Sequence, residues 1–388
     1  MNKQPKSIID LDLPIETQKI DLFNVKSIST TPELELPGAI VEVTPVQSAH
    51  LRLESITNCP RCTKPLVPAK SVSGVESTSF LECPECGTLI NTYKPTHYQA
   101  IFLRRRERYK MTAGGFGSGK SRSNIEDVIK HVLLIPNARV CVTARTYPAL
   151  ESTFLKDFYA MFPAKLVKSK NDQKHEMSLT NGSEVLFRSF DDPTKLKSMN
   201  LTMAVIVEAS DVPEKGFDML QSRVRNTAAM LPYYDAQGNP VMEWVPEKKA
   251  YQIKYRVDVR HINLETNPDS GWVKKFLLES TVVEFFGDAY NEGYKFSKTR
   301  DPQKYTQVVT TSANPYLPPG YEEEQTRNKS EGYIQQFFRG SFNFSSNLVF
   351  PNFGLCIVTP KALPRAFNDD GRRVLYYLIG LDYGERLP

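Results

Sequence analysis

The sequence predicts an α/β protein with a largely parallel sheet, built around one strand–loop–helix–strand unit. The run GGFGSGKS at Gly114–Ser121 fits the phosphate-binding loop pattern G-x-x-x-x-G-K-[ST]. Residues 108–112 predict a strand that enters this loop, and apolar residues at helical spacing after Ser121 predict a helix with one buried face. Pro136 ends that helix, and residues 138–144 predict a second, buried strand. This order is the βαβ unit on which nucleotide sites are built.

The residue types of the loop indicate phosphate binding. Glycines lack a Cβ atom, so consecutive backbone N–H groups can turn toward phosphate oxygens. Lys120 would place a positive charge on the β- and γ-phosphates, and the Ser121 hydroxyl would bind Mg²⁺. The sequence therefore predicts an ATP (or GTP) site, with a Gly/Ser-rich surface loop as the alternative. Its nucleotide-binding residues are Gly114, Gly115, Gly117, Ser118, Gly119, Lys120 and Ser121.

Length and charge set broad limits on the function. A chain of 388 residues predicts two or three domains. The net charge of +5 is spread along the chain, which permits a nucleic-acid partner without requiring one. No apolar run approaches about 18 residues, and the N-terminus lacks a signal-peptide pattern. We therefore expect a cytosolic protein with no membrane association.

Composition divides the chain into four expected parts. Residues 1–50 are rich in Pro, Thr and acidic residues and predict an extended arm. Residues 51–95 contain four of the six cysteines and predict a small zinc-ribbon-like module. Residues 96–330 carry the nucleotide signals, with a β-rich insertion near 227–262. Residues 331–388 alternate turns with short apolar strands.

Two C-x-x-C pairs predict a structural zinc site. Cys59 and Cys62 form the first pair and Cys83 and Cys86 the second, a spacing typical of tetrahedral Cys₄ zinc. The alternatives are disulfides, which a reducing cytosol disfavours, and a redox pair, which would need no second copy. A Cys₄ site has no open coordination position, so we assign it no catalysis.

A phosphate loop also needs an acid at the end of an apolar strand. Residues 203–208, MAVIVE, predict such a strand and identify Glu208 as the carboxylate that activates water. The usual pattern has two adjacent acids, whereas the preceding residue here is Val207. Either Glu208 serves both roles, or Asp211 or a water-bridged group assists the metal.

Other polar residues are candidates for contacts with the nucleotide. Residues 308–314 predict a strand that ends in Ser312 and Asn314, which could sense the γ-phosphate. Gln99, before the loop, could hydrogen-bond an adenine edge. An arginine finger would stabilise transition-state charge. Its candidates are Arg145, Arg223 and Arg225, each of which is also a plausible structural arginine.

Four motifs, in order, carry a resemblance to a known family. GGFGSGKS, VCVTARTYPAL, VIVEAS and TTSANPYLPPGY resemble the large terminase subunit of tailed bacteriophages, from about residue 95 to the C-terminus. The resemblance implies a P-loop ATPase of the additional-strand class that moves double-stranded DNA into a prohead, followed by an RNase H-like nuclease domain. It gives Lys120 and Ser121 the Walker A roles and Glu208 that of the catalytic glutamate. It places Ser312 and Asn314 in the coupling motif and Gln99 in the adenine motif.

The resemblance also implies partners and a location. The partners are double-stranded DNA, the portal, the small terminase subunit and other copies of the chain in a ring on the prohead. The location is the host cytoplasm, with transient residence on the prohead. The zinc pairs are not part of the family's general pattern.

The C-terminal residues resemble the start of the nuclease. Residues 374–384 read as an apolar strand that ends in Asp382, which the resemblance makes a nuclease metal ligand. Two-metal chemistry needs several carboxylates. The chain stops six residues later, so we expect no DNA cleavage by this chain and a truncated product or one exon of an interrupted gene.

Two alternative functions remain open from the sequence. One is a helicase-like or repair ATPase with a zinc ribbon, although its further motifs are not visible. The other is a zinc-ribbon DNA-binding or assembly protein with a degenerate nucleotide site, an alternative that Val207 supports.

Overall fold

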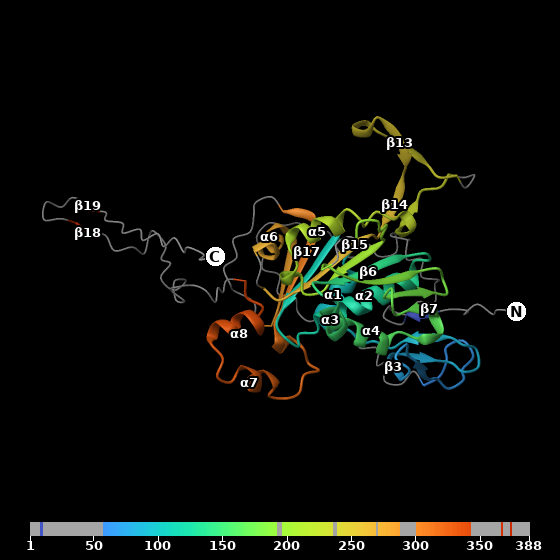
Figure 1. Cartoon of the computed structure of the whole chain (residues 1–388), viewed down its shortest axis with the longest axis horizontal. Helices are drawn as coiled ribbons and strands as arrows, with labels where there is room; N and C mark the ends of the chain where they lie inside the picture. Colours follow the sequence, from blue (N-terminus) through green and yellow to red (C-terminus); the bar gives the residue numbers. More distant parts are fainter. Residues whose placement is uncertain are drawn as a thin grey trace, which may run out of the picture. The chain divides into compact units, whose positions relative to one another are not determined.

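The computed structural model divides the chain into two units, residues 1–343 and 344–388 (Figure 1). It describes residues 8–10, 57–191, 196–235, 239–268, 271–287, 300–342, 366–367 and 373–374. In the second unit, β18 (Ala366–Phe367) pairs antiparallel with β19 (Arg373–Val374). Asp382 lies outside the described residues, as does most of the expected strand over 374–384. Residues 331–343, expected to begin the C-terminal part, belong to the first unit.

A nine-stranded mixed sheet forms the centre of the first unit, in the order β16-β17-β5-β15-β10-β6-β9-β8-β7. From β16 to β9 all neighbours pair in parallel, and an antiparallel edge of β8 and β7 follows. The predicted α/β fold with a largely parallel sheet is therefore confirmed. The strands are β5 (Tyr109–Gly114), β6 (Arg139–Ala144), β7 (Val167–Asn171), β8 (Glu176–Leu179), β9 (Glu184–Ser189), β10 (Met203–Ile206), β15 (His261–Thr266), β16 (Ser280–Phe286) and β17 (Asp301–Val309).

Helices cover both faces of this sheet (Figure 1). Central strands are buried on both faces, so successive residues of β10 alternate between two apolar cores: Met203 packs with α2, and Ala204 packs with α5 and α6. The helices are α1 (His97–Arg104), α2 (Lys120–Leu134), α3 (Tyr147–Leu150), α4 (Lys156–Met161), α5 (Glu214–Gln221), α6 (Gly271–Glu279), α7 (Tyr321–Thr326) and α8 (Glu331–Phe337). A π-helical turn joins α3 to α4 at Glu151–Leu155. Short 3₁₀ turns lie at Ala164–Leu166, Ala209–Asp211, Thr227–Ala229, Pro246–Lys248 and Thr311–Ala313.

The predicted strand–loop–helix–strand unit is present as β5, the loop, α2 and β6. One face of α2 buries Ile125, Val128 and Val132, the residues whose spacing predicts the helix. The helix ends at Leu134, and Pro136 follows its C-cap, Ile135. The unit thus places the loop at the carboxyl edge of the parallel strands.

The four cysteines lie in the segments that flank the strands of a small sheet, which packs on the large one. Its order is β1-β4-β3-β2, with β1 (Ile8–Asp10) parallel to β4 (Leu89–Asn91) and β3 (Glu76–Glu82) antiparallel to both β4 and β2 (Val67–Lys70). Phe80 and Leu89 of this sheet are buried in the same apolar core as α2. The zinc-ribbon-like segment is therefore not a separate unit, because it completes the core of the larger fold.

Residues within the expected β-rich insertion form two short antiparallel pairs that project from the sheet (Figure 1). They are β11 (Met230–Pro232) with β14 (Tyr255–Asp258), and β12 (Met242–Val245) with β13 (Ala250–Ile253). In the part of the chain that the structure describes, no helix has the length and apolarity needed to cross a bilayer.

Candidate nucleotide site and four-cysteine cluster

The loop between β5 and α2 has the conformation that its glycines allow. Gly119 caps α2 with a left-handed φ of +88°, where a side chain would be strained. A Cβ atom on Gly115 would lie 2.5 Å from the carbonyl oxygen of Phe338 and 2.5 Å from the Thr311 hydroxyl. The backbone conformation therefore requires glycine at position 119, and the close approach of Phe338 and Thr311 requires it at position 115.

Lys120 points back over the loop. Its Nζ donates to the carbonyl oxygens of Gly114 and Gly115, each at 3.1 Å, and to Asn267 Oδ1 at 3.2 Å. Burial lowers the pKa of this amine, and the nearby carboxylates Glu208 and Glu265 oppose that effect. The predicted phosphate-binding lysine is thus held at the mouth of the loop by polar partners.

Glu208 follows the end of β10 and has a left-handed backbone, with φ of +49°. Non-glycine residues in this region carry strain, which proteins retain mostly at functional sites. Asn267 Nδ2 donates to Glu208 Oε2 at 3.2 Å, so Asn267 joins Glu208 to Lys120. Burial raises the pKa of Glu208, and the charge of Lys120 offsets part of that rise.

The carboxyl end of β15 supplies site residues that the sequence reasoning missed. This strand lies between β5 and β10, so its last residues reach the loop. Ser121 Oγ donates to Glu265 Oε1 at 3.0 Å, and Asn124 Nδ2 donates to Glu265 Oε2 at 2.9 Å. Burial and the neighbouring Glu208 raise the pKa of Glu265 to about 7. The signal was the polar ending of residues 265–267 (ETN), which follows a segment with apolar residues at 262 and 264 and resembles the pattern that identified Ser312 and Asn314.

Gln99 lies beside the loop, and its carboxamide is occupied by the protein. Its Oε1 accepts from the Thr96 N–H at 2.8 Å and the Tyr93 hydroxyl at 2.7 Å. Its Nε2 donates to the carbonyl oxygen of Gly119 at 3.2 Å. These bonds start α1 and tie it to the loop, and the adenine contact remains a prediction.

Ser312 and Asn314 lie beyond the end of β17, in and after a 3₁₀ turn. Asn314 Nδ2 donates to the carbonyl oxygen of Gly117 at 2.6 Å, and the Ser312 hydroxyl bonds that of Thr310 at 2.7 Å. Asn314 thus contacts the loop backbone, whereas Asn267 contacts Lys120 itself. Phosphate sensing by Ser312 and Asn314 remains a prediction.

The candidate arginine fingers have different surroundings in the structure. Arg145 is exposed after β6 and donates to the Asp211 carbonyl oxygen at 3.4 Å. Arg223 and Arg225 follow α5. Among the described residues, no hydrogen bond or ion pair joins these three side chains to the loop. The choice among them remains open.

A buried polar cluster lies under the middle of α2. Asp127 Oδ2 accepts from Lys110 Nζ at 2.6 Å, His261 Nε2 at 2.9 Å and Asn263 Nδ2 at 2.8 Å. Burial alone would raise the pKa of Asp127, but the charges of Lys110 and His261 hold it well below its usual value. This cluster joins α2 to β5 and β15, the two strands that frame the loop.

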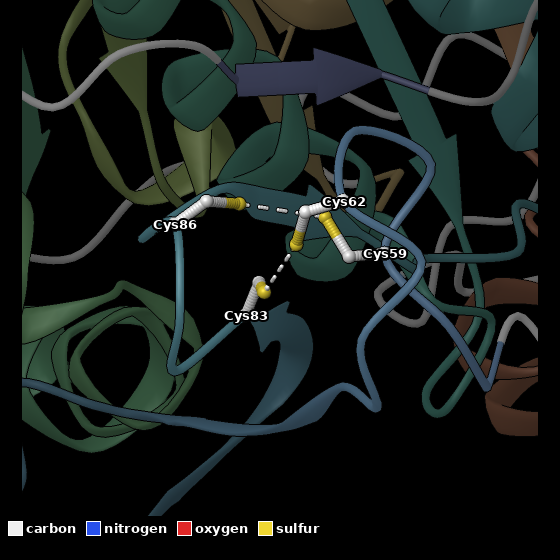
Figure 2. Close-up of side chains that lie close together, drawn as sticks. All are labelled: Cys59, Cys62, Cys83 and Cys86. Carbon is white, nitrogen blue, oxygen red and sulfur yellow. Dashed lines mark hydrogen bonds between the residues drawn. The ribbon is translucent and has the colours of Figure 1, made fainter.

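The two cysteine pairs converge in one cluster, and all four sulfur atoms lie within 4.8 Å of one another (Figure 2). Cys59 Sγ lies 3.5 Å from Cys86 Sγ, and Cys62 Sγ lies 3.4 Å from Cys83 Sγ. All four are free thiols, which excludes disulfides among them in this structure. Hydrogen bonds from the Thr88 hydroxyl and amide lower the pKa of the Cys86 thiol to about 6.

These features define an α/β protein with a phosphate-loop motif at the carboxyl edge of a parallel sheet. The family model of the phage terminase large subunit matches residues 106–337. The chain belongs to this family, which confirms the resemblance seen in the motifs.

Similar proteins include a curated relative and two solved structures. The PBSX phage terminase large subunit of Bacillus subtilis (strain 168) is 26% identical over 266 residues, which cover 66% of this chain and 54% of the relative. The chain thus spans about half the length of that relative. The large terminase ATPase domain of Thermus phage P74-26 is 16% identical, with a TM-score of 0.45 over 64% of this chain and 94% of that one. The large terminase of a thermophilic bacteriophage, in complex with ADP, is 14% identical, with a TM-score of 0.44 over 64% of this chain and 54% of that one.

Proposed function

We propose that this chain is the ATP-hydrolysing motor part of a terminase large subunit, which moves double-stranded viral DNA into a prohead. The observation that carries the proposal is the convergence of the loop lysine and the candidate catalytic glutamate. Asn267 bonds both Lys120 and Glu208, although they come from separate segments of the chain. Family membership supplies the link from such a site to DNA packaging.

The side chains at the site fit ATP with Mg²⁺. Hydroxyl and carboxylate oxygens are the ligands that Mg²⁺ prefers, and the Ser121 hydroxyl and the carboxylates of Glu208 and Glu265 are available at the site. Bound Mg²⁺ would neutralise charge on the β- and γ-phosphates. Lys120 would orient the same phosphates, and Glu208 would accept a proton from the attacking water.

The strand order supports a finer assignment within the P-loop proteins. β15 lies between the loop strand β5 and the Glu208 strand β10, as an additional strand would. We therefore assign the domain to the additional-strand class of P-loop ATPases. As partners we propose double-stranded DNA, the portal, the small terminase subunit and further copies of the chain in a ring. The host cytoplasm is the proposed location.

ATP turnover in the presence of double-stranded DNA tests this function. We expect the purified chain to hydrolyse ATP and to do so faster when double-stranded DNA is added, because a translocase couples turnover to its track. Phosphate release measured with and without DNA checks this. ATP turnover that DNA does not stimulate would contradict the motor assignment but not the nucleotide site. A chain that binds no nucleotide would contradict both.

We further propose that the four-cysteine cluster holds structural Zn²⁺. Tetrahedral Zn–S bonds of about 2.3 Å place sulfur atoms about 3.8 Å apart, and the closest pairs here are already near that spacing. The buried Cys59 and Cys83 sit on knuckles at the end of a sheet that shares the main core. Zinc would therefore stabilise the first unit as a whole rather than act in catalysis.

Zinc removal is expected to destabilise the protein. We expect about one zinc per chain in the wild type. Cys86→Ser should lower that content and the Tm together, with about 2–4 °C lost for each kcal/mol. Elemental analysis and thermal melting check this. Cys141→Ala is the matched control, since Cys141 is buried in β6 outside the cluster and should leave the zinc content unchanged. A zinc-free wild-type chain with an unchanged Tm on chelation would contradict the proposal.

A further inference from the structure

The strand that carries Glu208 lacks the second acid usual at such sites. The residue before Glu208 is Val207, which is 1% exposed and packs in the apolar core with α2. A valine side chain offers no ligand to a cation. If the chain binds magnesium with its nucleotide, either Glu208 serves both acidic roles or another residue supplies the second acid.

Strand register identifies Glu265 as the neighbour of that position. β10 and β15 are parallel, and Ile206 of β10 is paired with Leu264 of β15. The next residue in each segment is Val207, directly after the end of β10, and Glu265 of β15, so continuing the register places an acid beside the position where one is missing. Residues paired across parallel strands share a face of the sheet, and this face lies under α2.

The contacts of Glu265 suit a cation ligand. Its side chain is fully buried, and its two oxygens accept only from neutral donors, Ser121 Oγ and Asn124 Nδ2. Among the described residues, no Lys, Arg or His lies within salt-bridge distance of it. Lys120 acts on Glu265 only through its charge, from beyond ion-pair distance, and a buried carboxylate without a paired cation is costly.

Asn124 gives a second, independent indication. It is fully buried on the first turns of α2, and its Nδ2 bonds Glu265. The Oδ1 atom of the same carboxamide has no hydrogen-bond partner in the part of the chain that the structure describes. The side chain that bonds the buried acid therefore also carries an unsatisfied oxygen, which an electropositive group would satisfy.

We propose that Glu265, together with Ser121, holds the magnesium ion of the bound nucleotide, in place of the acid that β10 lacks. This inference rests on the proposed function. Glu208 is then free for its role toward water, since Asn267 fixes it on the Lys120 side of the site. Magnesium binding and water activation then depend on acids at the ends of two neighbouring strands, β15 and β10, instead of on two adjacent acids at the end of one strand.

Mn²⁺ binding to the full chain in the presence of ADP tests the proposal. Glu265→Gln keeps the shape and an acceptor for Ser121 but removes the charge. We expect ADP affinity in EDTA to stay unchanged and the Kd for Mn²⁺, measured by electron paramagnetic resonance with ADP bound, to rise about 10- to 100-fold. Asp211→Asn is the competing variant, because Asp211 also lies near Glu208, and it should leave Mn²⁺ affinity unchanged.

The outcomes separate the possible roles of Glu265. If Glu265 only positions Ser121 and Asn124, then Glu265→Gln will bind Mn²⁺ as the wild type does, and the proposal is overturned. A loss confined to Asp211→Asn overturns it as well. A wild-type chain that binds no ADP overturns the proposed function and this inference together. If Glu265→Gln does not fold by thermal melting, Glu265→Ala removes the carboxylate without placing an amide in the buried site, and wild-type Mn²⁺ affinity in that variant contradicts the proposal.

Discussion

Replacing Glu208 by glutamine is expected to reduce kcat for ATP hydrolysis by about 10²- to 10⁴-fold, the usual contribution of a positioned general base. ATP binding should persist, because Lys120 keeps its contacts with the loop and Asn267. Glutamine retains a carbonyl oxygen for Asn267 Nδ2, so the local structure should survive. Phosphate release under steady state and ATP binding at equilibrium measure the two effects separately.

Two control variants make this result specific. Glu247→Gln changes an exposed acid in the projecting insertion and should leave turnover at the wild-type rate. Lys120→Ala should lose ATP binding and turnover together, because it removes the phosphate contact. Wild-type turnover in Glu208→Gln would mean that the catalytic carboxylate lies elsewhere.

The largest effect on stability is expected from Asp127→Ala. Lys110 is 1% exposed, so in this variant its charged amine would stay buried without the carboxylate that pairs with it. Breaking a buried ion pair in this way costs about 3–5 kcal/mol, because the remaining charge has no partner. His261 and Asn263 would lose the same acceptor. Urea denaturation, followed by circular dichroism, gives the free energy of unfolding.

An exposed ion pair is the matched comparison. Lys170 and Asp172 lie 2.7 Å apart on the surface of the edge strands, and Asp172→Ala should cost no more than about 1 kcal/mol. The double variant Lys110→Met with Asp127→Leu should recover part of the loss, because it removes both charges instead of one. Equal destabilisation by Asp127→Ala and Asp172→Ala would contradict the role of burial.

Local sequence predicted the parts of the site that lie next to one another in the chain. The loop, the helix after it and the strand end at Glu208 follow from periodicity and glycine placement, and the structure contains them in that form. The spacing of the cysteines likewise predicted four thiols in one place. Such features depend on neighbours within a few residues.

Strand order explains what the sequence could not supply. Glu265 and Asn267 follow Lys120 by more than a hundred residues, and they reach it only because β15 inserts between β5 and β10. Sequence reasoning found the polar ending of β17 instead, whose strand lies on the other side of β5. Sequence reasoning also missed the Lys110–Asp127 ion pair, because no feature of the neighbouring sequence shows that both side chains are buried.

The helix that begins at Lys120 has a second set of partners between one and two turns further on. Glu126 accepts from Asn91 at 3.3 Å and from Arg122 at 3.1 Å, and Asn91 belongs to the cysteine-bearing sheet. Helix α2 therefore begins at the proposed nucleotide site and contacts the small sheet next to the four cysteines. If the chain binds both ligands as proposed, and if nucleotide binding shifts α2, then nucleotide would change the zinc affinity, and zinc would change the nucleotide affinity by the same factor. A zinc-bound cysteine cluster would then stabilise the nucleotide-binding helix as well as the small sheet next to it.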